Sequence, residues 1–178
     1  MALTSNISSL DSFSAGFSNQ TSFDYKLFRI NAERVLERNK SIKILAFTAE
    51  LQNSERQSIE NRQRKIYSNF HVLEQDDHGN LVTAKTRPEY YPIYFTSSEL
   101  NAKSVIGLDI GLSKAVKTAL KSAEKTKQVN ATLTSLKSDP QNKLFLGIAP
   151  LYHETTFTQK TNHNQASGFM LALFDLDN

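Results

Sequence analysis

The sequence predicts an α+β fold in which a long N-terminal helix precedes an antiparallel sheet with flanking helices. Three observations lead to this fold class. No glycine or proline interrupts residues 22–52, and the apolar residues there recur with a helical spacing. Strand-like segments later in the chain follow one another through short turns, which favours antiparallel pairing. A strongly amphipathic helix separates the first strands from the later ones.

The N-terminal third of the chain divides into a lead-in and a helical stalk. Residues 1–21 are rich in serine and sparsely apolar, so we expect a flexible or weakly helical lead-in. Residues 22–66 form the predicted stalk and dimerisation segment, which ends in a shorter helix at Ser54–Lys65 with Ser54 as its N-cap. Apolar residues recur in the stalk at intervals of seven, as a heptad-like seam made of Phe28, Val35, Ile42 and Ala49.

Residues 67–178 are predicted to form the sheet with its packed helix. Residues 70–75 are predicted to be a strand, and residues 76–80 (DDHGN) supply the turn after it. A second strand at 90–95 is dense in aromatic and β-branched side chains, and Pro92 inside it indicates an edge position or a bulge. Three further strands are predicted near the C-terminus, at 130–137, 144–152 and 168–176.

The amphipathic helix is predicted at Ser113–Ala123. Its apolar face consists of Leu112, Ala115, Val116, Ala119, Leu120 and Ala123. The other side carries Lys114, Lys117, Lys121 and Lys125. A lysine-rich face could bind an anion such as nucleic acid, but a solvated helix face is the commoner arrangement. Because the net charge of the chain is only +3, we expect no nucleic-acid partner.

The overall composition excludes several function classes. A length of 178 residues suits one domain. The chain has no cysteine, which rules out disulfides, thiolate nucleophiles and cysteine-based zinc sites. No apolar run approaches the ~20 residues that a membrane helix needs. Any contact with a membrane is therefore expected only through flanking helices that are absent from this chain.

The sequence lacks the common motifs of catalysis. It contains no glycine-rich phosphate loop, no HExxH and no GxSxG. His153, Glu154 and His163 could in principle bind a metal, but their loose spacing is more typical of a solvated loop. We therefore expect neither enzymatic activity, nor a cofactor, nor a bound metal.

A single carboxylate is the candidate ligand-binding group. In IGLDIG (106–111), strand alternation would place Gly107, Asp109 and Gly111 on one face. The two glycines would leave open space around Asp109, and an ionised carboxylate accepts strong hydrogen bonds from a ligand N–H group. The alternative is that Asp109 accepts hydrogen bonds from backbone N–H groups at the start of the following helix. The spacing does not decide between these two roles.

The aromatic strand offers possible walls for a pocket beside Asp109. Strand alternation places Tyr91, Ile93 and Phe95 on one face. Apolar walls next to one directed polar group suit a small-molecule site. Aromatic residues on a strand face are, however, more often part of the core.

Six blocks of the sequence occur in the order of one known family. They are SERQSIE (54–60), RPEYYPIYF (87–95), Asn101 followed by IGLDIG (106–111), the helix Ser113–Ala123, LFLGIAPLY (144–152) and GFMLALFDL (168–176). Together they resemble the CHASE domain, the extracytoplasmic sensory module of plant cytokinin receptors and many bacterial sensor proteins. The likeness spans roughly residues 50–176, and the agreement of several blocks makes it specific.

The resemblance implies a PAS-like sheet after a long N-terminal helix along which the domain forms a homodimer. It also implies a periplasmic or other extracytoplasmic location between two membrane helices, with a histidine kinase or diguanylate cyclase as the output domain. Asp109 matches the family's aspartate that holds the adenine ring of cytokinins. Asn130 to Thr132 match a strand that contributes main-chain contacts to the ligand.

Two hypotheses follow for the function. The first is a non-catalytic sensor that binds a cytokinin-like purine or another small metabolite, with Asp109, Gly107, Tyr91, Ile93, Phe95, Asn130 and Thr132 as its site. The second is a protein-interaction or dimerisation module without a small ligand, whose functional surface is the heptad-like seam. A cavity beside Asp109 would count against the second hypothesis.

From the sequence alone we predict that Asp109→Ala abolishes ligand binding and leaves the fold intact. A binding titration with a confirmed ligand tests the first part, and the circular dichroism spectrum of the variant tests the second. Normal binding by the variant would show that Asp109 has another role.

Overall fold

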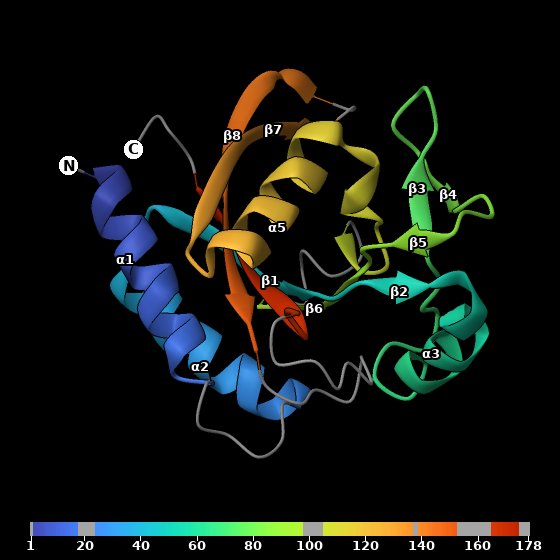
Figure 1. The fold of residues 1–178 in the computed structure, drawn as a ribbon, viewed down its shortest axis with the longest axis horizontal. Coiled ribbons are helices and arrows are strands. Elements are labelled where there is room, and N and C mark those ends of the chain that lie inside the picture. Colours follow the sequence, from blue (N-terminus) through green and yellow to red (C-terminus); the bar gives the residue numbers. More distant parts are fainter. Residues whose placement is uncertain (1, 18–23, 98–104, 137–138, 153–164, 175–178) are drawn as a thin grey trace.

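An antiparallel sheet forms the centre of the fold (Figure 1). The computed structural model describes residues 2–17, 24–97, 105–136, 139–152 and 165–174. In this part of the chain the sheet consists of β1 (Ile42–Thr48), β6 (Ile93–Thr96), β7 (Asn130–Leu136), β8 (Asp139–Leu151) and β9 (Gly168–Phe174). Their spatial order is β6-β1-β9-β8-β7, and all neighbours are antiparallel. The predicted α+β class and the last three strands are thereby confirmed.

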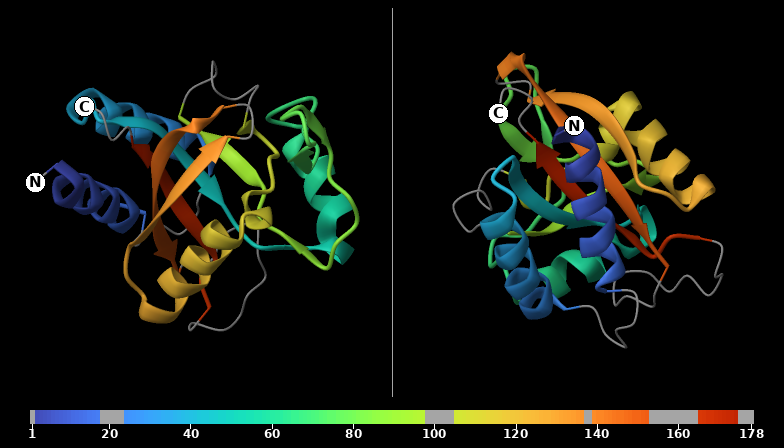
Figure 2. Two further views of the ribbon diagram at one scale, coloured as in Figure 1. Left: turned by 90° about the horizontal axis from the view of Figure 1, so that it is seen from above. Right: turned by 90° about the vertical axis from the view of Figure 1, so that its left-hand side faces the viewer.

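Helices cover both faces of this sheet, and Figure 2 shows them on opposite sides. We call the face under α1 (Ala2–Ala15) and α2 (Tyr25–Arg38) the first face, and the face under α5 (Lys114–Thr126) the second face. Strand alternation divides the apolar residues between two cores. On β9, Met170 and Ala172 belong to the core of the first face, whereas Phe169 and Leu171 belong to that of the second.

Helix α1 replaces the flexible lead-in that we expected. Serine is a poor helix former in isolation, but tertiary packing overrides this preference when an apolar face is available. Leu10, Phe13 and Phe17 provide that face and are at most 5% exposed. The ring of Phe13 packs edge-on against Phe28 of α2, with 6.0 Å between the ring centroids. The two helices therefore share one apolar core with the sheet.

The predicted long helical stalk is wrong beyond residue 38. Helix α2 ends at Arg38, where the side-chain amide of Asn39 donates to the Val35 carbonyl at 2.9 Å. Residues 42–48 are a strand because IKILAFT pairs with β6 on one side and β9 on the other. Because a central strand is buried on both faces, its apolar residues do not alternate with polar ones. The sequence pattern then does not distinguish such a strand from a buried helix. Ile42 and Ala49 of the seam thus lie in the core.

Helix α5 confirms the predicted amphipathic helix. Ser113 is its N-cap and accepts a hydrogen bond from the Val116 N–H at 3.4 Å. Four residues of the predicted apolar face are buried, namely Val116, Ala119, Leu120 and Ala123. Leu112 precedes the helix and is 49% exposed, so the apolar face is one turn shorter than predicted.

A smaller lobe lies beside the edge of the sheet, on the side of β6 (Figure 1). It contains η1 (Asn53–Glu55), α3 (Arg56–Gln63) and two short strand pairs, β2 (Leu51–Gln52) with β5 (Glu89–Tyr90) and β3 (Leu73–Gln75) with β4 (Leu81–Thr83). The turn between β3 and β4 is the predicted one, because Asp76 Oδ1 accepts from the backbone N–H groups of His78 and Asn80. Helix α3 begins two residues after Ser54, which does not cap it.

The strand predicted at 90–95 is divided by Pro92 and contains a bulge. Thr48 of β1 lies opposite Ile93, whereas Phe47 lies opposite Phe95, so Tyr94 is an extra residue on β6. The bulge turns Phe95 to the first face, where its ring stacks with Phe47. The prediction that Phe95 shares a face with Tyr91 and Ile93 is therefore wrong. Pro92 lies beside a bulge on an edge strand, as expected for proline.

Glu60 joins α3 to the chain that enters β3. Its carboxylate accepts from Arg56 Nε at 3.0 Å, from Arg64 Nη2 at 3.1 Å and from the Val72 N–H at 3.0 Å. Burial by itself would raise the pKa of Glu60, but the hydrogen bonds from Val72 and Arg56 lower it below its ordinary value. The ionised carboxylate therefore stabilises the lobe.

We predict that Glu60→Gln lowers the free energy of unfolding at neutral pH by about 3 kcal/mol, because two partly buried arginines lose their counter-charge. The folded-state pKa lies below the ordinary value of 4.5, so this stabilisation is present above pH 4.5 and is lost as the pH falls through the folded-state pKa. Urea unfolding at neutral and acidic pH measures both effects. Glu33→Gln, in an exposed pair with Arg29, is the matched control. Equal losses in the two variants would contradict the prediction.

Candidate functional site

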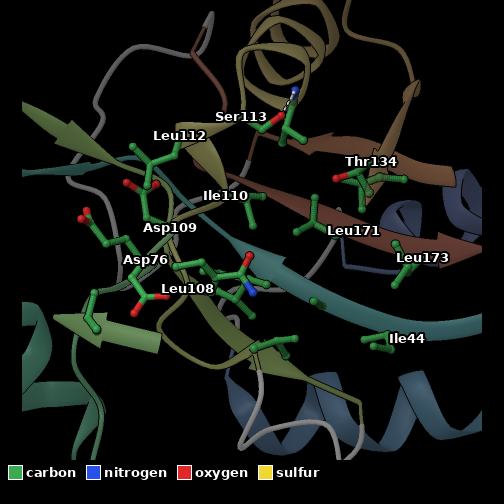
Figure 3. Close-up of a pocket in the computed structure, with 18 of the residues that line it drawn as sticks. Ile44, Asp76, Leu108, Asp109, Ile110, Leu112, Ser113, Thr134, Leu171 and Leu173 are labelled. Carbon is green, nitrogen blue, oxygen red and sulfur yellow. Dashed lines mark hydrogen bonds between the residues drawn. The ribbon is translucent and has the colours of Figure 1, made fainter. Parts of the chain in front are cut away.

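A cavity of about 700 Å³ lies between the second face of the sheet and the smaller lobe (Figure 3). Its walls are residues 105–113, the first turn of α5 and the hairpin of β3 and β4. Its floor is the sheet, which contributes Ile44, Ala46, Ile93, Leu146, Leu171 and Leu173. No aromatic side chain is among the residues that line it. The interior surface is thus mainly aliphatic.

One end of the cavity is charged. Figure 3 shows Asp76 and Asp109 together at this end, and Thr134 and Leu173 at the opposite end. Arg87 lies at the charged end as well, where Nη1 donates to Glu74 Oε2 at 2.7 Å and Nη2 donates to Asp109 Oδ2 at 3.2 Å. This ion triad joins the hairpin of the smaller lobe to the segment that leads into α5.

Arg87 is held in place by its aromatic neighbour as well as by its two carboxylates. Its guanidinium lies over the Tyr90 ring, 5.3 Å from the centroid, an arrangement that favours a cation. Burial would lower the pKa of Arg87, but its bonds to Glu74 and Asp109 raise the pKa overall. The hydrogen bond from Arg87 in turn holds the pKa of Glu74 below its ordinary value. Arg87 and Glu74 are therefore charged at neutral pH.

Asp109 performs the backbone-bonding role that the sequence left open, and it also lines the cavity. Its Oδ1 accepts from the N–H groups of Tyr91 at 2.8 Å and Gly111 at 3.0 Å. It is the N-cap of η2 (Ile110–Leu112) and is only 4% exposed. A carboxylate with two backbone bonds and a guanidinium partner is a structural anchor. The other carboxylate oxygen, Oδ2, accepts the hydrogen bond from the side chain of Arg87.

The open space predicted around Asp109 is filled by the chain itself. A Cβ atom on Gly107 would lie 2.0 Å from the His71 carbonyl oxygen, and Gly107 has a φ of +82°. A Cβ atom on Gly111 would lie 2.7 Å from Tyr91 Cδ2. The glycines permit close approach of neighbouring segments and leave no room for a ligand. Residues 106–111 make only isolated bridges, through Leu108 and Asp109, so the strand alternation assumed for them is also wrong.

The structure brings together only part of the predicted site. Asp109 and Ile93 line the cavity. Tyr91 lines a neighbouring hollow of about 440 Å³, and its hydroxyl donates to Glu50 Oε2. Burial raises the pKa of the Tyr91 phenol above its ordinary value.

The other predicted residues lie elsewhere. Phe95 is in the first-face core, and Gly107 is packed against His71. Asn130 donates to the Ser122 hydroxyl at 2.8 Å, and neither Asn130 nor Thr132 is among the lining residues. Sequence reasoning missed Arg87 and Glu74. Arg87 is the first residue of RPEYYPIYF, one of the six blocks that resemble the CHASE domain. Its place in that block was the signal by which sequence reasoning could have found it.

Two further observations concern metals and membranes. Within the described ranges, no group of three or more His, Asp or Glu side chains is placed to hold a metal ion. His153, Glu154 and His163 lie outside those ranges. Among the described helices, none is both long and apolar enough to cross a bilayer.

The fold of this chain is similar to that of the periplasmic sensory domain of the Campylobacter jejuni chemoreceptor Tlp1, with a TM-score of 0.56 and 11% sequence identity. The similarity covers 99% of this chain and 55% of that one, so the chain spans about half the length of the Tlp1 domain. At this identity the likeness establishes the fold alone.

The chain belongs to the CHASE domain family, whose model matches residues 21–178. The resemblance seen in the six blocks is thereby confirmed. The match begins after α1. No curated protein matches the chain significantly. Family membership and the likeness to a periplasmic sensory domain together support an extracytoplasmic sensing domain.

The contacts of Asp109 change the prediction for its alanine variant. Asp109→Ala removes the acceptor of the Tyr91 and Gly111 N–H groups and of Arg87 Nη2, so we predict a loss of about 3 kcal/mol in the free energy of unfolding. We therefore expect this variant to be less stable than wild type, in contrast to the intact fold that the sequence alone predicted. Urea unfolding measures the loss, and Asp77→Ala, an exposed carboxylate in the neighbouring turn, is the control. Wild-type stability of Asp109→Ala would show that these bonds contribute little.

Proposed function

We propose that this chain is a non-catalytic, extracytoplasmic sensing domain that binds a small molecule in the cavity over the second face of the sheet. The cavity itself is the observation that carries this proposal. Its volume of about 700 Å³ lies within the range of small-molecule sites, and it combines apolar walls with a few polar groups at one end. Membership of the CHASE family supports a sensory role.

The ion triad defines the proposed recognition end. Asp109 and Ile93 are retained from the sequence-based site as direct ligand contacts, and Arg87 and Glu74 are added to them. We assign Gly107 and Tyr91 to a supporting role, because they pack around the segment that holds Asp109. No cofactor takes part in this proposal.

Ligand binding is proposed to act through the connection that Arg87 makes. Glu74 is on the hairpin, whereas Asp109 leads into α5, so a ligand that changes these bonds changes how the two elements are held. The shift available to a receptor is limited to the differential affinity of the ligand for two arrangements, typically ~1–3 kcal/mol.

The surrounding receptor is proposed from the family and not from the contacts described above. It would be a membrane protein with a histidine kinase or diguanylate cyclase output, and its sensing domain would be PAS-like and homodimeric. The heptad-like seam is largely unsuited to the dimer contact, because Phe28, Ile42 and Ala49 are at most 4% exposed within one chain. A contact through the N-terminal helices would instead use their outer sides, where Ile30 is 41% exposed.

The alternative of an interaction module without a small ligand is less well supported. It predicts a well-packed sheet with Asp109 committed to backbone N–H groups. Asp109 does accept from two such groups, but the cavity lies beside it. It also uses the seam as its surface, and that seam is mostly core.

We predict that Thr134→Trp abolishes small-molecule binding. Thr134 lines the end of the cavity opposite the ion triad, on the edge strand β7, so a larger side chain fills the cavity and leaves the charged end intact. A thermal-shift screen of purines and other metabolites on wild-type protein first finds a ligand, since binding to the native state raises its stability.

Leu133→Trp is the matched control for this experiment. Leu133 is the neighbouring residue of β7, is 51% exposed and does not line the cavity. We expect the control to bind like wild type. Equal binding by the two tryptophan variants would place the ligand outside the cavity and overturn the proposal.

A further inference from the structure

The walls of the cavity restrict the shape of its ligand. The floor presents branched aliphatic side chains from four strands, including Ile44 of β1, Leu146 of β8 and Leu171 of β9. The opposite wall adds Val105, Ile110 and Val116. Flat aromatic ligands gain most from stacking on aromatic faces, and no lining residue provides one. Such walls fit a rounded or branched aliphatic body.

The charged end restricts the chemistry of the ligand's polar group. Its carboxylates are Glu74, Asp76, Asp77 and Asp109, and its cations are Lys85 and Arg87. Among the described residues at this end, negative charge therefore exceeds positive charge by two. Asp76 is committed to the turn, where its oxygens accept from the N–H groups of His78 and Asn80 and from the Asn80 side chain. The excess negative charge favours a cation at this end.

Glu74 supplies the acceptor for such a cation. Its side chain is nine-tenths buried, with 10% exposed, and it lines the cavity. Its Oε2 accepts from Arg87 Nη1 and from the Lys85 N–H. Its Oε1 has no hydrogen-bond partner among the described residues. A carboxylate oxygen that faces a cavity and has no partner in the protein can form a strong bond to a charged donor, and an anion there would meet four carboxylates.

We propose that the cavity binds a primary amine or similar cation carried on a compact aliphatic body, with the cation at Glu74 Oε1 and the body on the sheet. This inference rests on the proposed function, since it names the ligand class of the same cavity. The cavity would disfavour flat purines because it lacks aromatic walls, and carboxylate ligands because of its excess negative charge. The specificity residue is Glu74.

Rigid adamantane derivatives test this inference, because they share one aliphatic body and differ only in the group at a bridgehead carbon. Isothermal titration calorimetry compares the amine, the alcohol and the carboxylate, with adenine as the flat probe. We expect the amine to bind about tenfold more tightly than the alcohol, and the carboxylate and adenine to bind more weakly still.

Two variants locate the effect at the charged end. Glu74→Gln is expected to weaken binding of the amine about tenfold more than it weakens binding of the alcohol, because both probes lose the support of the ion triad but only the amine loses a charged acceptor. Asp77→Asn lowers the negative charge without touching the ion triad, and a smaller loss is expected for it. Glu33→Gln on α2 removes an exposed carboxylate that is not among the lining residues and serves as the control. Circular dichroism of each variant verifies its folding.

The outcomes separate the ligand class from the function. Equal or tighter binding of the carboxylate or adenine, or failure of every adamantane probe to bind, overturns the proposed class. An amine preference that survives in both Glu74→Gln and Asp77→Asn also overturns it. The sensing function is decided independently by the metabolite screen and Thr134→Trp. A metabolite bound in wild type and lost in Thr134→Trp upholds that function even if the adamantane series fails.

Discussion

The ion triad of Arg87, Glu74 and Asp109 is the interaction on which the arrangement of the cavity depends. A buried charge needs a partner, and here one guanidinium satisfies two carboxylates from different parts of the fold. Glu74 fixes the hairpin of the smaller lobe, and Asp109 fixes the turn into α5 through two backbone N–H groups. Because the hairpin and the turn into α5 are both held at the charged end, they leave the sheet between them uncovered. The cavity is the space over this uncovered part of the sheet.

The same triad explains how one residue can be both structural and suited to recognition. Asp109 is almost completely buried, yet it borders the cavity because the chain packs around it from one side only. Gly107 and Gly111 make that packing possible by letting His71 and Tyr91 approach closely. In the site that we propose, a change at the charged end would alter the bonds of the segment that leads into α5.

Local patterns predicted much of the fold, and they failed where burial is two-sided. Helix α5 and strands β7, β8 and β9 followed from periodicity, since each has one buried face or a clear apolar run. Strand β1 was predicted as helix because it is a central strand, between β6 and β9, with residues buried on both of its faces, and the alternation that identifies a strand is lost. The bulge at Tyr94 moved Phe95 to the other face; Pro92 indicated an edge position or a bulge, but not which residue would be the extra one.

The sequence by itself determined the α+β class, the membership of the CHASE family and the importance of Asp109. These follow from residue order and local spacing, which the chain carries before it folds. Only the tertiary structure decided what Asp109 does, because its partners Arg87 and Tyr91 are 22 and 18 residues away in the chain. It also decided that a cavity exists, since an unfilled volume depends on how distant elements pack and not on the identity of any one residue.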